Sequence, residues 1–465
     1  AVDEFISLYN LELTGRDAGA QEGFSRRGFV DVRSVATPDL AAKCIAYGDS
    51  AKQIEVVSLG DEIGLKRPSG KTVTEDFRTW LKSEGLTPAD VDPTAGGDWE
   101  KIVFGPGAAV AKPRLYYWSE KYQNAYGIAA IKERTDIIRK YLPNAGIGAN
   151  FSPHHGFARQ AYIGEVYKWV TLFRKEGMTM PWSEDYIWQL PVGSQQMNFI
   201  NLDLSRAAIR GMDGMRIHYY VMPHWPGNTP MQWRRQFYGD LGHGMKDVNL
   251  FEFRPVQVAY TENHVTHNPM YGEILKSFYE LGQFEDIVQK GAVRGGTAAL
   301  WFSEVSDAWR DNQGSMSAAK RSMYTAILHQ QLQLDFVVDQ DATDGILAEY
   351  KVLYVTDPHL HSASAAAIAA WVKKGGRLLA TAGAGMFDEY NQPNKVFREL
   401  LGVDQSALEA PAAKQIGYIK QDLPFVDPVD TVTWKHGDRT VAIPAFGACS
   451  RFAVKGAEVI GTFSD

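Results

Sequence analysis

The feature that most constrains this fold is a series of short apolar runs, each followed by polar residues and separated by segments with helical periodicity. The clearest run, residues 54–60, is rich in β-branched residues and leads into Asp61 and Glu62. Such a run is typical of a buried parallel strand that presents acids at its carboxyl end. Four similar runs end near Phe151, Trp182, Met222 and Phe253. Their alternation with helices predicts a (β/α)8 TIM barrel.

The number of predicted strands indicates how the chain divides into domains. A closed barrel needs eight strands, so the first three would have to lie before residue 50, where the chain is too short for three βα units. We therefore expect the N-terminal strands to be missing, either because the sequence is part of a longer chain or because the N-terminal part is supplied separately. Residues 1–293 are predicted as the barrel, 294–402 as a flavodoxin-like α/β domain, and 403–465 as an incomplete β-rich segment.

Composition narrows the class of ligand. The 465 residues carry a net charge of −7, which gives no electrostatic footprint for nucleic acid, and no apolar run is long enough to span a bilayer. The two cysteines, Cys44 and Cys449, make neither a disulfide framework nor a Cys-rich zinc site. Small neutral ligands are the expected partners, and no compartment is assigned.

Glu62 is the first catalytic candidate. An acid with no basic neighbour in sequence, at the rim of an apolar barrel, can carry a proton near neutral pH and act as general acid/base. The alternative is an ordinary solvated carboxylate at a strand end. Other strand ends have to decide between these readings.

The strand-end motifs, taken in order, resemble those of glycoside hydrolase family 42 β-galactosidases. The resemblance covers residues 38–400 and rests on the order and spacing of several motifs together. These are Tyr47-Gly48-Asp49, Asp61-Glu62, residues 76–82, Asn150-Phe151, Trp182-Ser183-Glu184-Asp185-Tyr186, Asp203-Leu204-Ser205-Arg206, Phe251-Glu252-Phe253-Arg254, Glu262 and His264.

The resemblance implies hydrolysis of a β-glycoside such as a β-galactoside, a carbohydrate partner, no cofactor, and a homotrimer assembled through residues 294–402. The chain also departs from the family. Asp61 stands where the family has Asn, the family's zinc-binding Cys cluster is absent, and the seventh strand runs into Pro223-His224-Trp225 where a nucleophilic Glu is expected.

Glycoside hydrolysis usually needs two carboxyl groups, so Glu62 requires a partner. Glu184, Asp185 and Glu252 are the candidates. Glu184 is the first choice because it ends a short strand at the active face, near Trp182 and Tyr186, whose rings could pack on a sugar. A hydroxyl-binding role for Glu184 carries equal weight to a nucleophilic one. Alternation along the strand can instead turn Glu252 into the barrel interior.

The remaining strand-end side chains are predicted to bind substrate. Histidines fall on or just beyond several strands, but they lack the short spacing of a metal site, so no metal is predicted. The predicted substrate-binding residues are Asp61, Asn150, His154, Trp182, Asp185, His224, Trp225, Glu252, Arg254, Glu262 and His264.

Two other functions stay open at this point. A non-hydrolytic sugar-binding or scaffold protein with a degenerate barrel would also lack the seventh-strand Glu. A mechanism in which a His or a substrate group replaces the nucleophile is the third alternative. The α/β domain has no Cys at a strand-to-helix elbow, so we expect it to be catalytically inert.

Overall fold

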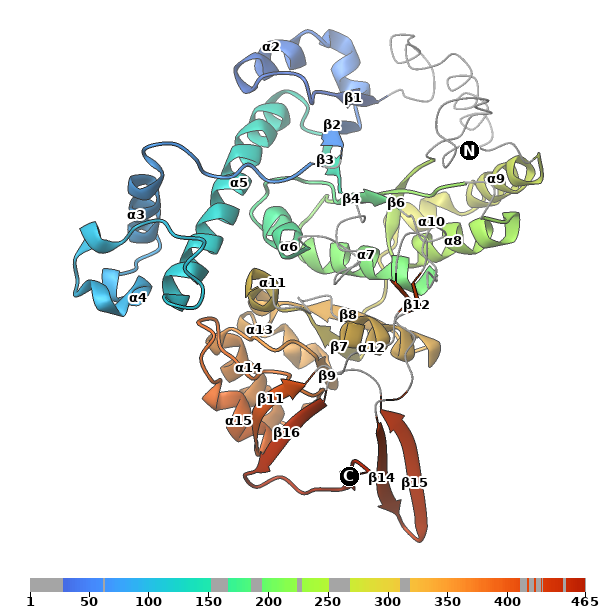
Figure 1. The fold of residues 1–465 in the computed structure, drawn as a ribbon. Helices are drawn as coiled ribbons and strands as arrows, with labels where there is room; N and C mark the ends of the chain where they lie inside the picture. The colour runs from blue at the N-terminus through green and yellow to red at the C-terminus, as the bar shows by residue number, and fades with distance from the viewer. Residues whose placement is uncertain are drawn as a thin grey trace. The chain divides into compact units, whose positions relative to one another are not determined.

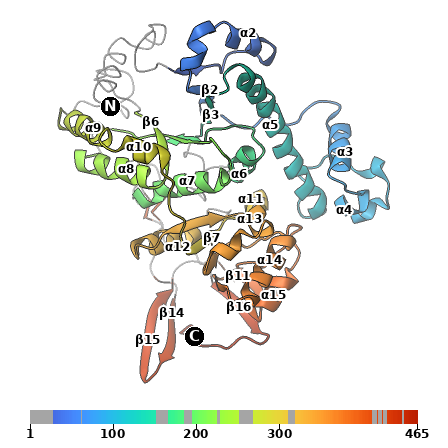
Figure 2. The same cartoon turned by 180° about the vertical axis from the view of Figure 1, so that it is seen from behind.

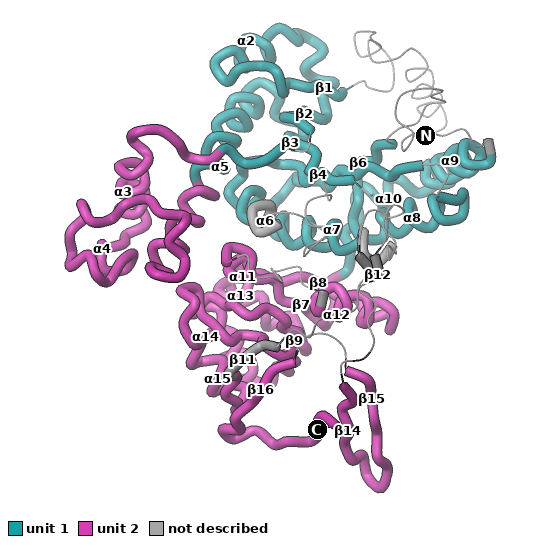
Figure 3. Tube along the Cα trace, in the orientation of Figure 1, with its two compact units in different colours: residues 1–66, 126–155, 168–294 teal, residues 67–125, 156–167, 295–465 magenta. Residues whose placement is uncertain are grey.

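The computed structural model describes residues 28–61, 63–151, 166–184, 195–223, 228–250, 268–309, 318–409, 416–417, 422–423, 428, 430–445 and 449–464. The chain divides into two compact units, shown in Figure 3. Unit 1 comprises Ala1–Lys66, Tyr126–His155 and Lys168–Arg294, and unit 2 comprises Arg67–Ala125, Gly156–Tyr167 and Gly295–Asp465. Among the described helices, none is both long and apolar enough to cross a bilayer.

Unit 1 is built on parallel strands. They form two three-stranded sheets of order β1-β2-β3 and β4-β5-β6, and a parallel bridge between Phe151 and Ser183 links β3 to β4. Every pairing in these sheets is parallel. The strands are β1 (Phe29–Asp31), β2 (Val56–Asp61), β3 (Gly146–Asn150), β4 (Trp182–Glu184), β5 (Ile217–Tyr220) and β6 (Met245–Asn249).

Helices follow these strands in the alternating order that parallel pairing requires. One helix, α8, begins with a capping box, in which Thr229 accepts from Gln232 N at 3.1 Å and Thr229 N donates to Gln232 Oε1 at 3.0 Å. The helices with residues in unit 1 are α2 (Leu40–Ile45), α5 (Pro113–Tyr141), α6 (Val166–Arg174), α7 (Gln195–Ala208), α8 (Pro230–Gly242), α9 (Asn268–Leu281) and α10 (Glu285–Lys290), with 3-10 turns η2 (Thr37–Asp39) and η3 (Gly48–Gln53).

The strands of unit 1 curve around an apolar interior. The rings of Phe29 on β1 and Trp182 on β4 meet edge to face, with centroids 5.8 Å apart, although their strands are not neighbours in the sheet. Only a sheet that bends around its inner face brings such side chains together. This curvature is the geometry of a barrel wall.

Three elements differ from the sequence prediction. The Gly- and Arg-containing stretch that ends near residue 37 is typical of a loop, yet it contains β1, a strand of three residues. The run predicted to end at Trp182 forms its strand at Trp182–Glu184 instead, so Glu184 belongs to the strand. The pattern of residues 272–290 predicts a single helix, but two helices cover this stretch, because a turn at residues 282–284 interrupts it.

The sheet of unit 2 is also parallel. Its order is β10-β9-β7-β8, so the chain moves from β7 to one side and then to the other, as in doubly wound folds. The point where the order reverses lies between β7 and β9. The strands are β7 (Ala298–Trp301), β8 (Leu334–Val337), β9 (Val352–Val355) and β10 (Arg377–Ala380).

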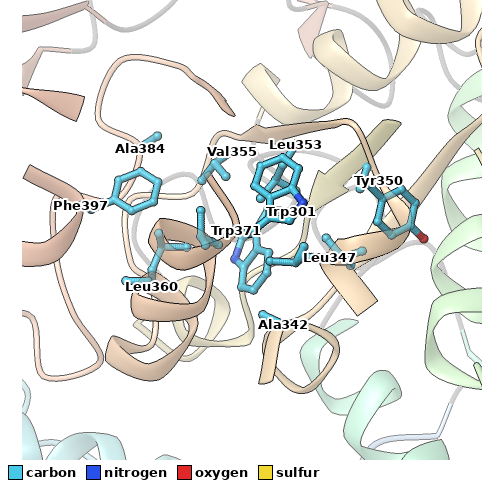
Figure 4. Packing of buried hydrophobic residues seen from close by; sticks show 14 residues of the cluster. Trp301, Ala342, Leu347, Tyr350, Leu353, Val355, Leu360, Trp371, Ala384 and Phe397 are labelled. Atoms are coloured by element: carbon cyan, nitrogen blue, oxygen red, sulfur yellow. The ribbon is translucent and has the colours of Figure 1, made fainter. Parts of the chain in front are cut away.

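A buried apolar cluster holds this sheet to its helices. Trp301 on β7, Leu353 on β9 and Trp371 on α14 belong to it, as Figure 4 shows. The N-cap of α14 is His361, whose ring accepts from Ala363 N at 3.1 Å; Ser364, which the sequence pattern favours for that position, lies within the helix. The helical elements of unit 2 are α3 (Val73–Ser83), α4 (Pro88–Val91), η4 (Pro93–Ala95), η5 (Trp99–Lys101), α11 (Glu304–Trp309), α12 (Ala318–His329), α13 (Asp339–Thr343), η7 (Ile346–Glu349), α14 (Ser362–Lys373) and α15 (Lys395–Leu401).

The C-terminal part of unit 2 is antiparallel. β11 pairs with β16, and this ribbon lies beside α15 in both views of Figures 1 and 2. A second sheet has the order β15-β14-β17, and β12 pairs with β13. The strands are β11 (Val403–Glu409), β12 (Ile416–Gly417), β13 (Asp422–Leu423), β14 (Asp430–His436), β15 (Arg439–Ala445), β16 (Cys449–Val454) and β17 (Gly461–Thr462).

Candidate active site

Three polar side chains meet at the carboxyl ends of β2, β3 and β4. The Nδ2 atom of Asn150 donates to Asp61 Oδ1 at 2.9 Å and to Glu184 Oε2 at 2.7 Å. Asn150 and Glu184 are only 3% and 4% exposed, whereas Asp61 is exposed. The strand ends of unit 1 therefore hold two carboxylates bridged by one amide.

A β-bulge in β2 turns Asp61 toward this cluster. Ser58 pairs with Gly148 and Asp61 with Asn150, so β2 has one more residue than β3 over this interval. Gly60 lies at the bulge with φ +156°, and a Cβ atom there would be 2.5 Å from Ile63 Cγ2. Glycine, which has no Cβ atom, allows the backbone at residue 60 to lie this close to the Ile63 side chain.

The shared amide limits the distance between the two carboxylates. Because Asp61 Oδ1 and Glu184 Oε2 bond the same nitrogen, their separation cannot exceed the sum of 2.9 and 2.7 Å, about 5.6 Å. Carboxyl groups at such a strand end can act as proton donor, base or nucleophile. A neighbouring acid can take one of these three roles.

Aromatic rings line the inner face next to Glu184. Trp182 and His218 pair in register and their ring centroids are 4.2 Å apart, while Tyr220, which pairs with Glu184, lies 5.7 Å from both rings. Tyr219 points the other way, where its hydroxyl bonds Asn201 of α7. Alternation along β5 thus assigns His218 and Tyr220 to the same face as Glu184.

His218 does not titrate near neutral pH. Burial, aided by the positive charge of Arg216, lowers the pKa of His218 to about 3. Its ring is therefore neutral under physiological conditions and serves as an apolar wall.

Four predicted site residues are described and lie together: Asp61, Asn150, Trp182 and Glu184. Sequence reasoning placed His218 on a strand but left it and Tyr220 out of the site; the alternation of residues 217–220 was the available signal. The other predicted residues lie outside the described part of the chain, namely Glu62, His154, Asp185, His224, Trp225, Glu252, Arg254, Glu262 and His264.

The described residues contain no group of three or more His, Cys, Asp or Glu side chains that could hold a metal ion. The chemistry available at the described strand ends is that of carboxylates, an amide and aromatic rings. These are groups that bind and transform polyhydroxylated ligands.

No protein-family model matches the sequence, and no curated protein matches it either. Solved structures do match. The β-galactosidase from Rahnella sp. R3 is 15% identical with a TM-score of 0.71 over 93% of this chain and 65% of its own. The chain has a GH42-like glycoside hydrolase fold.

Two further structures support this GH42-like fold. The β-galactosidase from Bacillus circulans sp. alkalophilus is 16% identical with a TM-score of 0.69, covering 93% of this chain and 66% of that one. A catalytic mutant of a GH42 β-galactosidase from G. stearothermophilus is 15% identical with a TM-score of 0.68, covering 93% and 65%. The chain thus spans just under two thirds of the length of these structures.

Proposed function

We propose that this protein is a glycoside hydrolase that acts on a β-glycoside of the β-galactoside type. The observation that carries the proposal is the cluster of Asp61, Asn150 and Glu184 at the carboxyl ends of successive parallel strands, in a chain with a GH42-like fold. In barrels of this kind, the carboxyl ends of the strands are where catalytic residues lie.

Glu62 is proposed as the general acid/base. It follows Asp61 directly, at the strand end that resembles the acid/base segment of family 42. It would protonate the oxygen of the departing group as the glycosidic bond breaks, and then take a proton from the water that enters.

Glu184 is proposed as the nucleophile. Residues 217–227, on β5 and beyond it, contain no Asp or Glu, so that strand end cannot supply the second carboxylate. Glu184 is buried at the end of β4, where the Asn150 amide donates to its Oε2 at 2.7 Å and fixes its position. Its carboxylate would form a glycosyl ester with the sugar, and water would then release the sugar with its anomeric configuration retained.

The mutational test uses a panel of nitrophenyl β-glycosides. Glu62→Gln and Glu184→Gln should each lower kcat/KM by roughly 10²–10⁴-fold, because each removes a group that takes part in the transition state. Glu349→Gln, at an exposed position in unit 2, is the matched control and should leave activity unchanged. Unchanged hydrolysis in both site variants would refute the assignment.

The panel also separates hydrolysis from binding alone. Wild-type protein that binds mono- or disaccharides in calorimetry without turning over any glycoside would be a sugar-binding protein. Turnover of any member with one fixed anomeric outcome would exclude that reading.

The assembly is a further part of the proposal. The resemblance to family 42 supports a trimer formed through residues 294–402, with residues 403–465 belonging to a separate β-rich domain. Light scattering on the purified 51.7 kDa chain should then give three times the mass of one chain. A monomer mass would contradict this part alone.

A further inference from the structure

The amide of Asn150 has two hydrogens, and both are used within the protein. One is donated to Asp61 Oδ1 and the other to Glu184 Oε2. The side chain is buried, with 3% of the residue exposed. Its nitrogen therefore has no hydrogen left to donate to a sugar hydroxyl, and its carbonyl oxygen Oδ1, which has no hydrogen-bond partner among the described residues, is itself buried.

The orientation of the amide follows from the charges around it. If the amide were rotated by 180°, its carbonyl oxygen would face two carboxylate oxygens. An ionised carboxylate has no hydrogen to donate, so no hydrogen bond would form. The donor orientation gives each acid one hydrogen bond, and the reverse orientation gives neither acid one.

We infer that Asn150 is a positioning residue that fixes Asp61 and Glu184 relative to each other, and that it is not a sugar ligand. The catalytic consequence of this positioning role depends on the proposed function, hydrolysis of a glycoside. The two N–H bonds hold the carboxyl groups of Asp61 and Glu184 in fixed positions, so Asn150 sets the orientation of the Glu184 side chain. The bulge at Gly60 brings Asp61 to the same amide and so couples the end of β2 to that of β4.

Monodeoxy substrates separate a positioning role from sugar binding. Asn150→Ala should lower kcat about 10–100-fold, the cost of removing a group that orients a catalytic ligand, with a smaller change in KM. The factor should be the same for a parent glycoside and for each of its monodeoxy analogues. If one analogue shows no difference between wild type and variant, Asn150 contacts the missing hydroxyl and the inference is overturned.

Two further variants guard against a loss of folding. Asn150→Asp keeps the size but replaces both donors by acceptors, so it should lose at least as much activity as Asn150→Ala. Asn394→Ala removes an equally buried Asn that caps α15 in unit 2, and should lower stability while kcat is unchanged.

A readout without substrate tests the bridge directly. In urea denaturation, Asn150→Ala should shift the midpoint less in an Asp61→Ala background than in wild type, since one bond is already lost. Additive shifts would overturn the inference. If no glycoside is hydrolysed but the shifts are non-additive, the proposed function fails and the bridge stands.

Discussion

Parallel strands in both units end near buried acids, but the acids have different partners. In unit 1, Glu184 shares the neutral amide of Asn150 with the exposed Asp61. In unit 2, Asp357 follows β9 and is 1% exposed, and both of its oxygens lie 2.8 Å from Nζ of Lys320, which is fully buried.

The comparison shows that a strand-end carboxylate is not by itself a functional group. Burial raises the pKa of Asp357 to about 6 even though Lys320 opposes the shift, and burial lowers the pKa of Lys320. Near them the Ser303 and Ser306 hydroxyls both donate to His359 O. These groups satisfy one another inside the fold, as structural elements do.

The largest effect should separate the two acids by activity. Glu184→Gln should abolish most of kcat/KM, by roughly 10²–10⁴-fold, whereas Asp357→Asn should leave it within about twofold when assayed on folded protein. Steady-state kinetics on a nitrophenyl glycoside measures both. Equal losses of activity in the two variants would show that Glu184 and Asp357 do not differ in their contribution to catalysis.

The next effect concerns stability in unit 2. Lys320→Met leaves Asp357 buried without its cation and should cost about 3–5 kcal/mol of unfolding free energy. The loss should be greater at pH 8 than at pH 5, because the buried acid takes up a proton at lower pH and stability falls as pH rises through its raised pKa. The double variant Lys320→Met/Asp357→Leu should recover most of the lost unfolding free energy. If it does not, the two side chains stabilise the fold by more than neutralising each other's charge.

His218 gives unit 1 an acid sensitivity of its own. With a folded pKa of about 3 against an ordinary value near 6.5, the unfolded chain binds a proton in this interval that the folded chain does not. Stability should therefore fall as pH drops from about 6.5 toward 3, by up to ~1.4 kcal/mol per pH unit. His218→Phe should flatten this slope in pH-dependent denaturation, and an unchanged slope would contradict the burial of the ring.

Helix caps should have the smallest effects, and equal ones in the two units. Thr229 caps α8 and Asn394 caps α15, each by accepting a backbone N–H bond at 3.1 Å. Replacement by Ala should cost about 1 kcal/mol in either case. Hydrogen exchange in each helix would measure it, and a large inequality would mean that the units differ in more than their strand-end chemistry.

Much of this architecture is predictable from sequence, since apolar runs alternating with amphipathic helices predict parallel pairing. Strand-end position also singles out Asp61, Asn150 and Glu184. Two features could not be predicted because they depend on contacts between residues that are distant in sequence. The three residues of β1 are too few to show a period, and the bridge by Asn150 depends on the bulge at Gly60, which no local pattern reveals.

The most direct test of the central claim is mass spectrometry after incubation with a 2-deoxy-2-fluoro glycoside carrying a good leaving group. Such a substrate slows hydrolysis of the glycosyl ester and lets it accumulate. We expect a mass gain of one fluorosugar per chain, mapped by peptide analysis to Glu184 and absent in Glu184→Gln. Turnover of glycosides with the label on another residue, or with no label at all, would contradict the assignment of Glu184 as nucleophile.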